Sequence, residues 1–101
     1  MPVHYTGIVH EHHAVRNTAG MFDVSHMGEF IIKGKNAESF LQYMTINDVA
    51  GLKPGQAQYS AMCMEDGGII DDLLIYRCRD RFIIVVNAAN IQKDFDWLEK
   101  N

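Results

Sequence analysis

Two adjacent carboxylates stand in the middle of an apolar run, GGIIDDLLIY at residues 67–76. A buried carboxylate is costly unless hydrogen bonds or an opposite charge compensate it. The run is short and rich in β-branched residues, so it predicts a strand after a glycine turn. Side chains alternate along a strand, which places Asp71 and Asp72 on opposite faces and rules out a cooperating pair. Asp72 is expected to share its face with Leu74 and Tyr76, as in the lining of a pocket.

Tyr59 lies in a second predicted strand, next to the strand that carries Tyr76. Two phenols beside one carboxylate can stack on a flat heteroaromatic ligand and form hydrogen bonds with it. The alternative is that both rings are edge residues of the core, with their hydroxyl groups in water. Composition and spacing alone favour this second interpretation, and a ligand site remains open.

Three other motifs suggest chemistry but lack the spacing that it requires. The run HEHH at 10–13 does not fit the zinc-protease spacing His-Glu-x-x-His, because Ala14 stands where the second histidine is needed. The residues of DVSH at 23–26 are too close in sequence to converge as a catalytic triad, so they predict a local turn. The glycine pair at 67–68 precedes no helix and no Gly-Lys-Ser/Thr, which favours a hairpin turn over a phosphate loop. No metal site is expected.

The composition is that of one globular domain. The chain has 101 residues, of which 48% are apolar and 22% charged, with a formal net charge of −4. Nothing basic predicts nucleic-acid binding, and no apolar run is long enough to span a membrane. The first residues lack the pattern of a signal peptide. Cys63 and Cys78 are expected to be buried reduced thiols, so we expect a cytoplasmic location.

Periodicity and turn residues predict an α+β fold, in which an antiparallel sheet is covered by helices on one face. Ferredoxin-like wiring is the leading topology. The continuous apolar run at 82–87 is expected to form a central strand covered on both sides. The expected helices span 6–20, 36–45 and 91–100, the expected strands span 57–64, 69–78 and 82–87, and residues 21–34 are expected to be extended.

Each of the last two predicted helices carries an apolar stripe at helical spacing. In the helix at 36–45 the stripe consists of Ala37, Phe40, Leu41 and Met44. In the helix at 91–100 it consists of Ile91, Phe95 and Leu98. Both helices are expected to pack against the sheet through these stripes.

Four motifs occur together and in order: MFDVSHMGEF, QYMTINDV, GGIIDDLLIY and VVNAAN. Over nearly the whole chain the sequence resembles the N-terminal part of the aminomethyltransferases, the T-proteins of the glycine cleavage system. The resemblance implies a folate-binding domain over residues 1–101. It also implies transfer of a carbon unit from the aminomethyl-lipoyl arm of the H-protein to tetrahydrofolate, with release of ammonia. Tetrahydrofolate is then the one-carbon acceptor, and the lipoylated H-protein is the partner.

The resemblance also assigns roles to residues. Asp72, the second Asp of the GGxxDDL motif, matches the family's key acid near the folate nitrogens. We expect an ionised carboxylate that supports nitrogen attack and is available for proton transfer as ammonia leaves. Asp71 is expected to have a structural role. The positions that match the family's folate-pocket lining are Tyr59, Tyr76, Leu74, Met27 and Asn87.

Family members begin earlier and continue through two further domains, so the resemblance implies that this chain is a fragment. We expect the folate-facing wall without its closing walls, little or no folate binding, and no turnover by the chain alone. Self-association through exposed apolar surface is also expected. Two alternatives remain: a non-catalytic folate-binding or scaffold module, and a small interaction domain with Asp72 in solvent and Tyr76 in the core. A eukaryotic member would be expected in the mitochondrial matrix.

Overall fold

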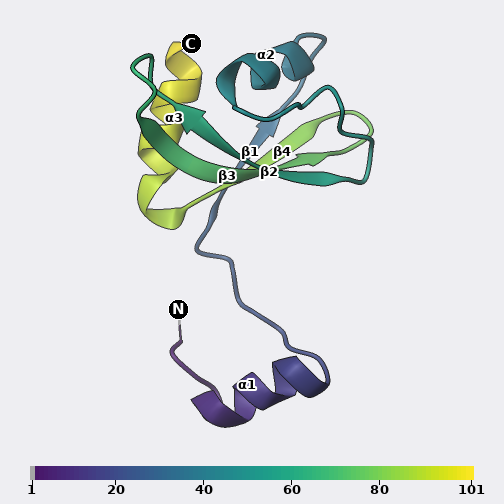
Figure 1. Cartoon of the computed structure of the whole chain (residues 1–101), viewed down its shortest axis with the longest axis vertical. Helices are drawn as coiled ribbons and strands as arrows, with labels where there is room; N and C mark the ends of the chain where they lie inside the picture. The colour runs from purple at the N-terminus through teal and green to yellow at the C-terminus, as the bar shows by residue number, and fades with distance from the viewer. Residues whose placement is uncertain (1) are drawn as a thin grey trace.

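The computed structural model describes residues 2–101 and divides them into a distant N-terminal helix and an α+β body (Figure 1). The extents of the whole chain are 46 × 28 × 20 Å. Its elements follow one another as α1 (Ile8–Asn17), β1 (Gly28–Ile32), α2 (Ala37–Met44), β2 (Ala57–Cys63), β3 (Ile69–Arg77), β4 (Phe82–Val86), η1 (Ala88–Asn90) and α3 (Ile91–Lys100).

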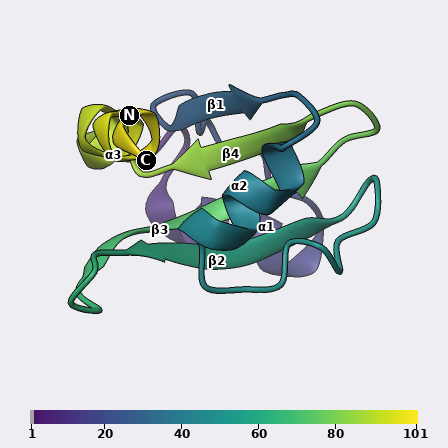
Figure 2. The ribbon, with the colours of Figure 1, turned by 90° about the horizontal axis from the view of Figure 1, so that it is seen from above.

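Four antiparallel strands form one sheet in the order β1-β4-β3-β2 (Figure 2). The predicted α+β class and the antiparallel sheet are therefore confirmed. The wiring differs from the ferredoxin-like β-α-β-β-α-β pattern, because α3 follows β4 instead of separating the third and fourth strands. The connections between β2, β3 and β4 are short enough for hairpins, and Gly67 in the first of these turns has a φ of 88°.

One face of the sheet carries the core. Alternation in β4 buries Phe82, Ile84 and Val86 on this covered face, while Ile83 and Val85 on the other face are half-buried. The predicted central position of β4 is confirmed, but among residues 2–101 helices cover only one of its faces. The core cluster also contains Ala37, Leu41, Met44, Val49, Leu52, Met62, Leu73, Ile75 and Leu98.

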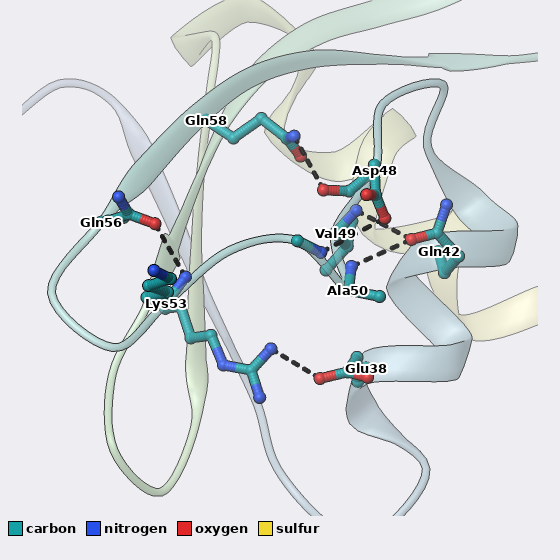
Figure 3. Close-up of polar contacts among 10 residues, drawn as sticks. Glu38, Gln42, Asp48, Val49, Ala50, Lys53, Gln56 and Gln58 are labelled. Carbon is teal, nitrogen blue, oxygen red and sulfur yellow. Dashed lines mark hydrogen bonds and ion pairs between the residues drawn. The ribbon is translucent and has the colours of Figure 1, made fainter.

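The loop between α2 and β2 is tied to the body by side-chain amides (Figure 3). The Gln42 side-chain oxygen accepts the backbone N–H groups of Val49 at 2.8 Å and Ala50 at 3.1 Å. Gln58 donates to the Asp48 carbonyl at 3.0 Å. These bonds satisfy loop N–H and C=O groups without secondary structure, and they hold Val49 in the core.

The buried stripe of α3 differs from the predicted one. Phe95 is 45% exposed and contacts Phe30 with ring centroids 5.9 Å apart, whereas Asp94 is completely buried. The packed positions are Ile91, Asp94 and Leu98, which are spaced three and four residues apart on one helix face. A carboxylate therefore occupies the centre of an apolar helix face.

The N-terminal helix lies apart from the sheet, at the end of an extended segment (Figure 1). No residue of α1 is buried. The residues that lead into it are held by Glu11, whose Oε1 accepts backbone N–H groups of Tyr5 at 2.6 Å and Thr6 at 2.5 Å. The Cα radius of gyration is 16.2 Å, compared with about 13 Å for a compact domain of this length, because the arm extends the molecule.

Within residues 2–101 Cys63 and Cys78 are not joined by a disulfide bond, and each is half-buried rather than buried as predicted. Cys63 ends β2 and Cys78 follows β3. No helix within residues 2–101 combines the length and the apolar character needed to cross a bilayer.

Gly28 sets how closely α3 approaches the sheet. A Cβ at this position would lie 2.6 Å from Cγ1 of Ile91 and 2.8 Å from Cγ2 of Val86. We expect Gly28→Ala to lower the free energy of unfolding by about 1–3 kcal/mol, because the added methyl group pushes α3 outward. Urea denaturation would measure the loss. Glu29→Ala, at the next and exposed position, is the control, and an equal loss in both variants would contradict this explanation.

Candidate functional site

The face of the sheet opposite the core carries the residues singled out in the sequence. The β3 side chains Asp72, Leu74 and Tyr76 point to this open face, as strand alternation predicts. Leu74 pairs with Tyr59 of β2 and with Val85 of β4, so these neighbours share the face. The result is an aromatic and aliphatic surface around one carboxylate.

The carboxylate of Asp72 is held by one donor on each oxygen. The phenol of Tyr59 donates to Oδ2 at 2.8 Å, and the side-chain amide of Asn87 donates to Oδ1 at 2.8 Å. The same amide lies 3.2 Å from the Asp72 carbonyl oxygen. Two fixed donors restrict the rotation of the carboxylate and leave a lone pair on each oxygen free.

The bond to Asp72 also changes the acidity of Tyr59. The hydrogen bond to the carboxylate, and then its negative charge, raise the pKa of the Tyr59 phenol above its ordinary value. Tyr59 is 64% exposed. Tyr59 therefore remains a neutral donor to Asp72 while presenting its ring to the solvent.

Asp71 lies on the covered face, where its contacts agree with the structural role predicted for it. It is 6% exposed, and its Oδ1 accepts the side-chain amides of Asn87 at 3.0 Å and Asn90 at 2.8 Å. The backbone N–H of Asn87 donates to Oδ2 at 3.3 Å. Burial alone would raise the pKa of Asp71, but hydrogen bonds from Asn87, Asp94 and Asn90 outweigh it and lower the pKa.

Sequence reasoning missed Asp94, which lies next to Asp71. Burial first, and then the contact with Asp71, raise the pKa of Asp94 to about 7, while Lys93 acts in the opposite direction. The signal in the sequence was the position of this aspartate three residues after Ile91 and four before Leu98, within an apolar stripe. A polar residue on such a stripe indicates a buried partner.

Asn87 and Met27 lie at the same end of the sheet. Asn87 directly follows β4 and contacts both neighbouring carboxylates. Met27 directly precedes β1, whose Gly28 pairs with Val86, so continuation of the register sets Met27 opposite Asn87. Met27 is half-buried, and it borders the site without a hydrogen bond to Asp72.

The motifs that lacked catalytic spacing prove to be local structure. Ser25 donates its hydroxyl to Asp23 Oδ1 at 2.5 Å and its backbone N–H to the same oxygen at 3.0 Å, which is the predicted turn. His10, His12 and His13 are exposed on α1. Within residues 2–101, no group of three or more His, Cys, Asp or Glu side chains is arranged to hold a metal ion.

The exposure of Asp72 and Tyr76 agrees only in part with the alternative of a small interaction domain. That hypothesis requires Asp72 in solvent and Tyr76 in the core. Asp72 is exposed, so the expected cavity around it is not formed by residues 2–101. Tyr76 is 39% exposed on the same face as Asp72, outside the core.

This arrangement suits recognition of a flat, nitrogen-containing ligand. The rings of Tyr59 and Tyr76 and the aliphatic Leu74 offer stacking and apolar contact. The held Asp72 carboxylate can accept a hydrogen bond from an N–H group or stabilise a positive charge that develops on nitrogen.

The whole chain matches a known family. A family model described as "GCVT N-terminal domain" matches residues 1–101. A protein of Chlorobaculum tepidum named aminomethyltransferase is 60% identical over 100% of this chain and 28% of its own length. One of Anoxybacillus flavithermus with the same name is 58% identical, again over 100% of this chain and 28% of its own length. The chain thus spans less than a third of these relatives.

A solved structure shares the fold. The crystal structure of the glycine cleavage system aminomethyltransferase T from Bartonella henselae superposes with a TM-score of 0.74 at 46% sequence identity. The superposition covers 78% of this chain and 22% of that one. At this identity the likeness extends to the sequence as well as the fold.

The bond between Tyr59 and Asp72 can be tested by titration of the phenol. In Asp72→Asn we expect the pKa of Tyr59 to fall towards its ordinary value of about 10, because the charged acceptor that favours the neutral phenol is lost. Carbon-13 NMR of tyrosine labelled at Cζ would follow the titration. Asp66→Asn, in the exposed turn before β3, is the control, and a Tyr59 pKa that does not change in Asp72→Asn would refute the contact.

Proposed function

This chain belongs to the GCVT N-terminal domain family, the aminomethyltransferase family of the glycine cleavage system, and we propose that it supplies the catalytic wall of a tetrahydrofolate-dependent aminomethyltransferase. In this reaction the aminomethyl carbon on the lipoyl arm of the H-protein forms bonds to two nitrogens of tetrahydrofolate. Its bonds to the amine nitrogen and to the lipoyl sulfur break. The two protons released by the folate nitrogens end on ammonia and on the lipoyl thiol.

The observation that carries the proposal is the held carboxylate of Asp72 on an aromatic face. With Tyr59 on one oxygen and Asn87 on the other, the carboxylate is oriented before any ligand arrives. A preorganised negative charge favours the positive charge that develops on an attacking nitrogen. A free lone pair also lets Asp72 take up or return a proton as ammonia leaves.

The remaining residues of the face fit a pterin-like ring. Tyr59 and Tyr76 offer aromatic surface, and Leu74 and Met27 offer apolar contact beside the acid. Asn87 influences the ligand mainly by donating a hydrogen bond to Asp72. Because the face is open, we assign its closure, and most of the binding energy for folate, to parts of the protein outside this chain.

In this proposal the partner is the lipoylated H-protein. The protein acts in the cytoplasm, or in the mitochondrial matrix of a eukaryote. Two free cysteines agree with a reducing compartment. Self-association of the isolated chain belongs to the proposal as well. Met21 is 95% exposed and Phe22 is 69% exposed on the N-terminal arm, which favours association through apolar contacts.

The second candidate function is a non-catalytic folate-binding or scaffold module of the same fold. Such a module requires the aromatic face but not a carboxylate oriented by two donors. The bonds of Tyr59 and Asn87 to Asp72 therefore favour the enzyme.

Substitution of the acid is the direct test of catalysis. In the whole gene product we expect Asp72→Asn to lower kcat for aminomethyl transfer by roughly 10²–10⁴-fold, because the neutral amide neither stabilises the developing charge nor accepts a proton. The assay would follow methylenetetrahydrofolate formation from aminomethylated H-protein. Asp80→Asn, on the exposed turn before β4, is the matched control. Normal turnover in Asp72→Asn, or a larger loss in Asp71→Asn, would contradict the assignment.

The isolated chain allows a separate test of how the site is divided. Calorimetric titration of the 101-residue chain with tetrahydrofolate is expected to give binding weaker than micromolar, since one open face buries little of the ligand. No turnover is expected in the same sample with aminomethylated H-protein. Micromolar binding would mean that this face alone holds the ligand.

A further inference from the structure

Asp94 presents an unusual chemical problem inside the fold. It is completely buried, and within residues 2–101 neither of its carboxyl oxygens receives a hydrogen bond from a donor. An ionised carboxylate in such a place is strongly unfavourable. The simplest resolution is a proton on Asp94, since a neutral carboxyl group carries its own donor and needs only an acceptor.

Asp71 is that acceptor. The interaction between their side chains lowers the pKa of Asp71 and raises that of Asp94, so the two carboxyl groups lie close enough to disfavour a charge on both. The distribution of donors decides which one keeps the charge. Asp71 receives the amides of Asn87 and Asn90, whereas Asp94 receives none, so the charge resides on Asp71 and the proton on Asp94.

The charge on Asp71 is connected to the open face through a single side chain. The amide nitrogen of Asn87 lies 3.0 Å from Asp71 Oδ1 and 2.8 Å from Asp72 Oδ1. The orientation of this amide is fixed by Asp71 on the covered face, and the amide in turn fixes Asp72 on the open face. The connected groups run in the order Asp94, Asp71, Asn87 and Asp72.

We propose that Asp94 is a positioning residue whose protonated carboxyl group anchors Asp71 and, through Asn87, holds the Asp72 carboxylate in place. The inference rests on the role proposed for Asp72 and adds that a proton on Asp94 keeps the Asp72 carboxylate oriented. Loss of this proton places two negative charges side by side, and Asn87 is then drawn away from Asp72 towards the excess charge.

The charges that act on Asp94 come from two elements. Burial, and after it Asp71 of β3, favour the protonated form of Asp94, whereas Lys93 of α3 opposes it. The Lys93 ammonium is directed to the carbonyl of Ile70, to which it donates at 2.7 Å. Together these effects raise the pKa of Asp94 to about 7, so its proton is lost near neutral pH.

The test is an NMR titration of the 101-residue chain without ligand. We expect the side-chain amide resonances of Asn87 and the carboxyl carbon of Asp72 to shift with a midpoint near the Asp94 pKa of about 7. Asp94→Asn should abolish that transition, because its amide still donates to Asp71 and cannot ionise. Asp96→Asn, at an exposed position of the same helix, should titrate like the unsubstituted chain.

Two outcomes would overturn the inference: Asn87 resonances that do not respond near this pH, or an Asp94→Asn variant that retains the transition. If Asp94 had only a structural role, its substitution would change the free energy of unfolding, and the Asn87 resonances would show no transition near pH 7. In the whole gene product, Asp94→Ala is expected to lower kcat by up to roughly 100-fold with little change in KM, and Asp94→Asn to restore it. If Asp72→Asn leaves turnover intact, the proposed function fails, while the titration still decides whether the Asp94 proton positions Asn87.

Discussion

The site depends on one side-chain amide that is shared between two carboxylates. Asn87 follows the last residue of β4 and reaches Asp71 and Asp72, which point to opposite faces of β3. Consecutive strand residues normally act independently because their side chains diverge. Here the end of the neighbouring strand connects them, so the packing of the covered face is transmitted to the exposed acid.

The two faces of the sheet separate stability from chemistry. The covered face holds the apolar core under α2 and α3, together with the buried Asp71 and Asp94. The open face displays Tyr59 and Asp72. Such a division permits changes on the open face at modest cost to folding, whereas a change at Asp94 affects both.

Strand alternation predicted the faces of Asp71 and Asp72, because a period of two depends only on local backbone geometry. The aromatic neighbours followed from the hairpin that pairs β2 with β3. The pairing of β1 with β4, and the position of Asp94, could not be predicted in the same way. Both depend on which distant segments meet, and the apolar stripe of α3 made Phe95 look like the more suitable core residue.

The pairing of β1 at the edge of β4 has a consequence for how the chain acquires its structure. Strands β2, β3 and β4 are joined by short turns and can assemble as a meander from local contacts. Strand β1 must wait for a partner about half the chain away, so closing that long loop is the entropically demanding step. Folding is therefore expected to nucleate in the hairpins and to finish with β1, in the same step that seats α3 over Gly28.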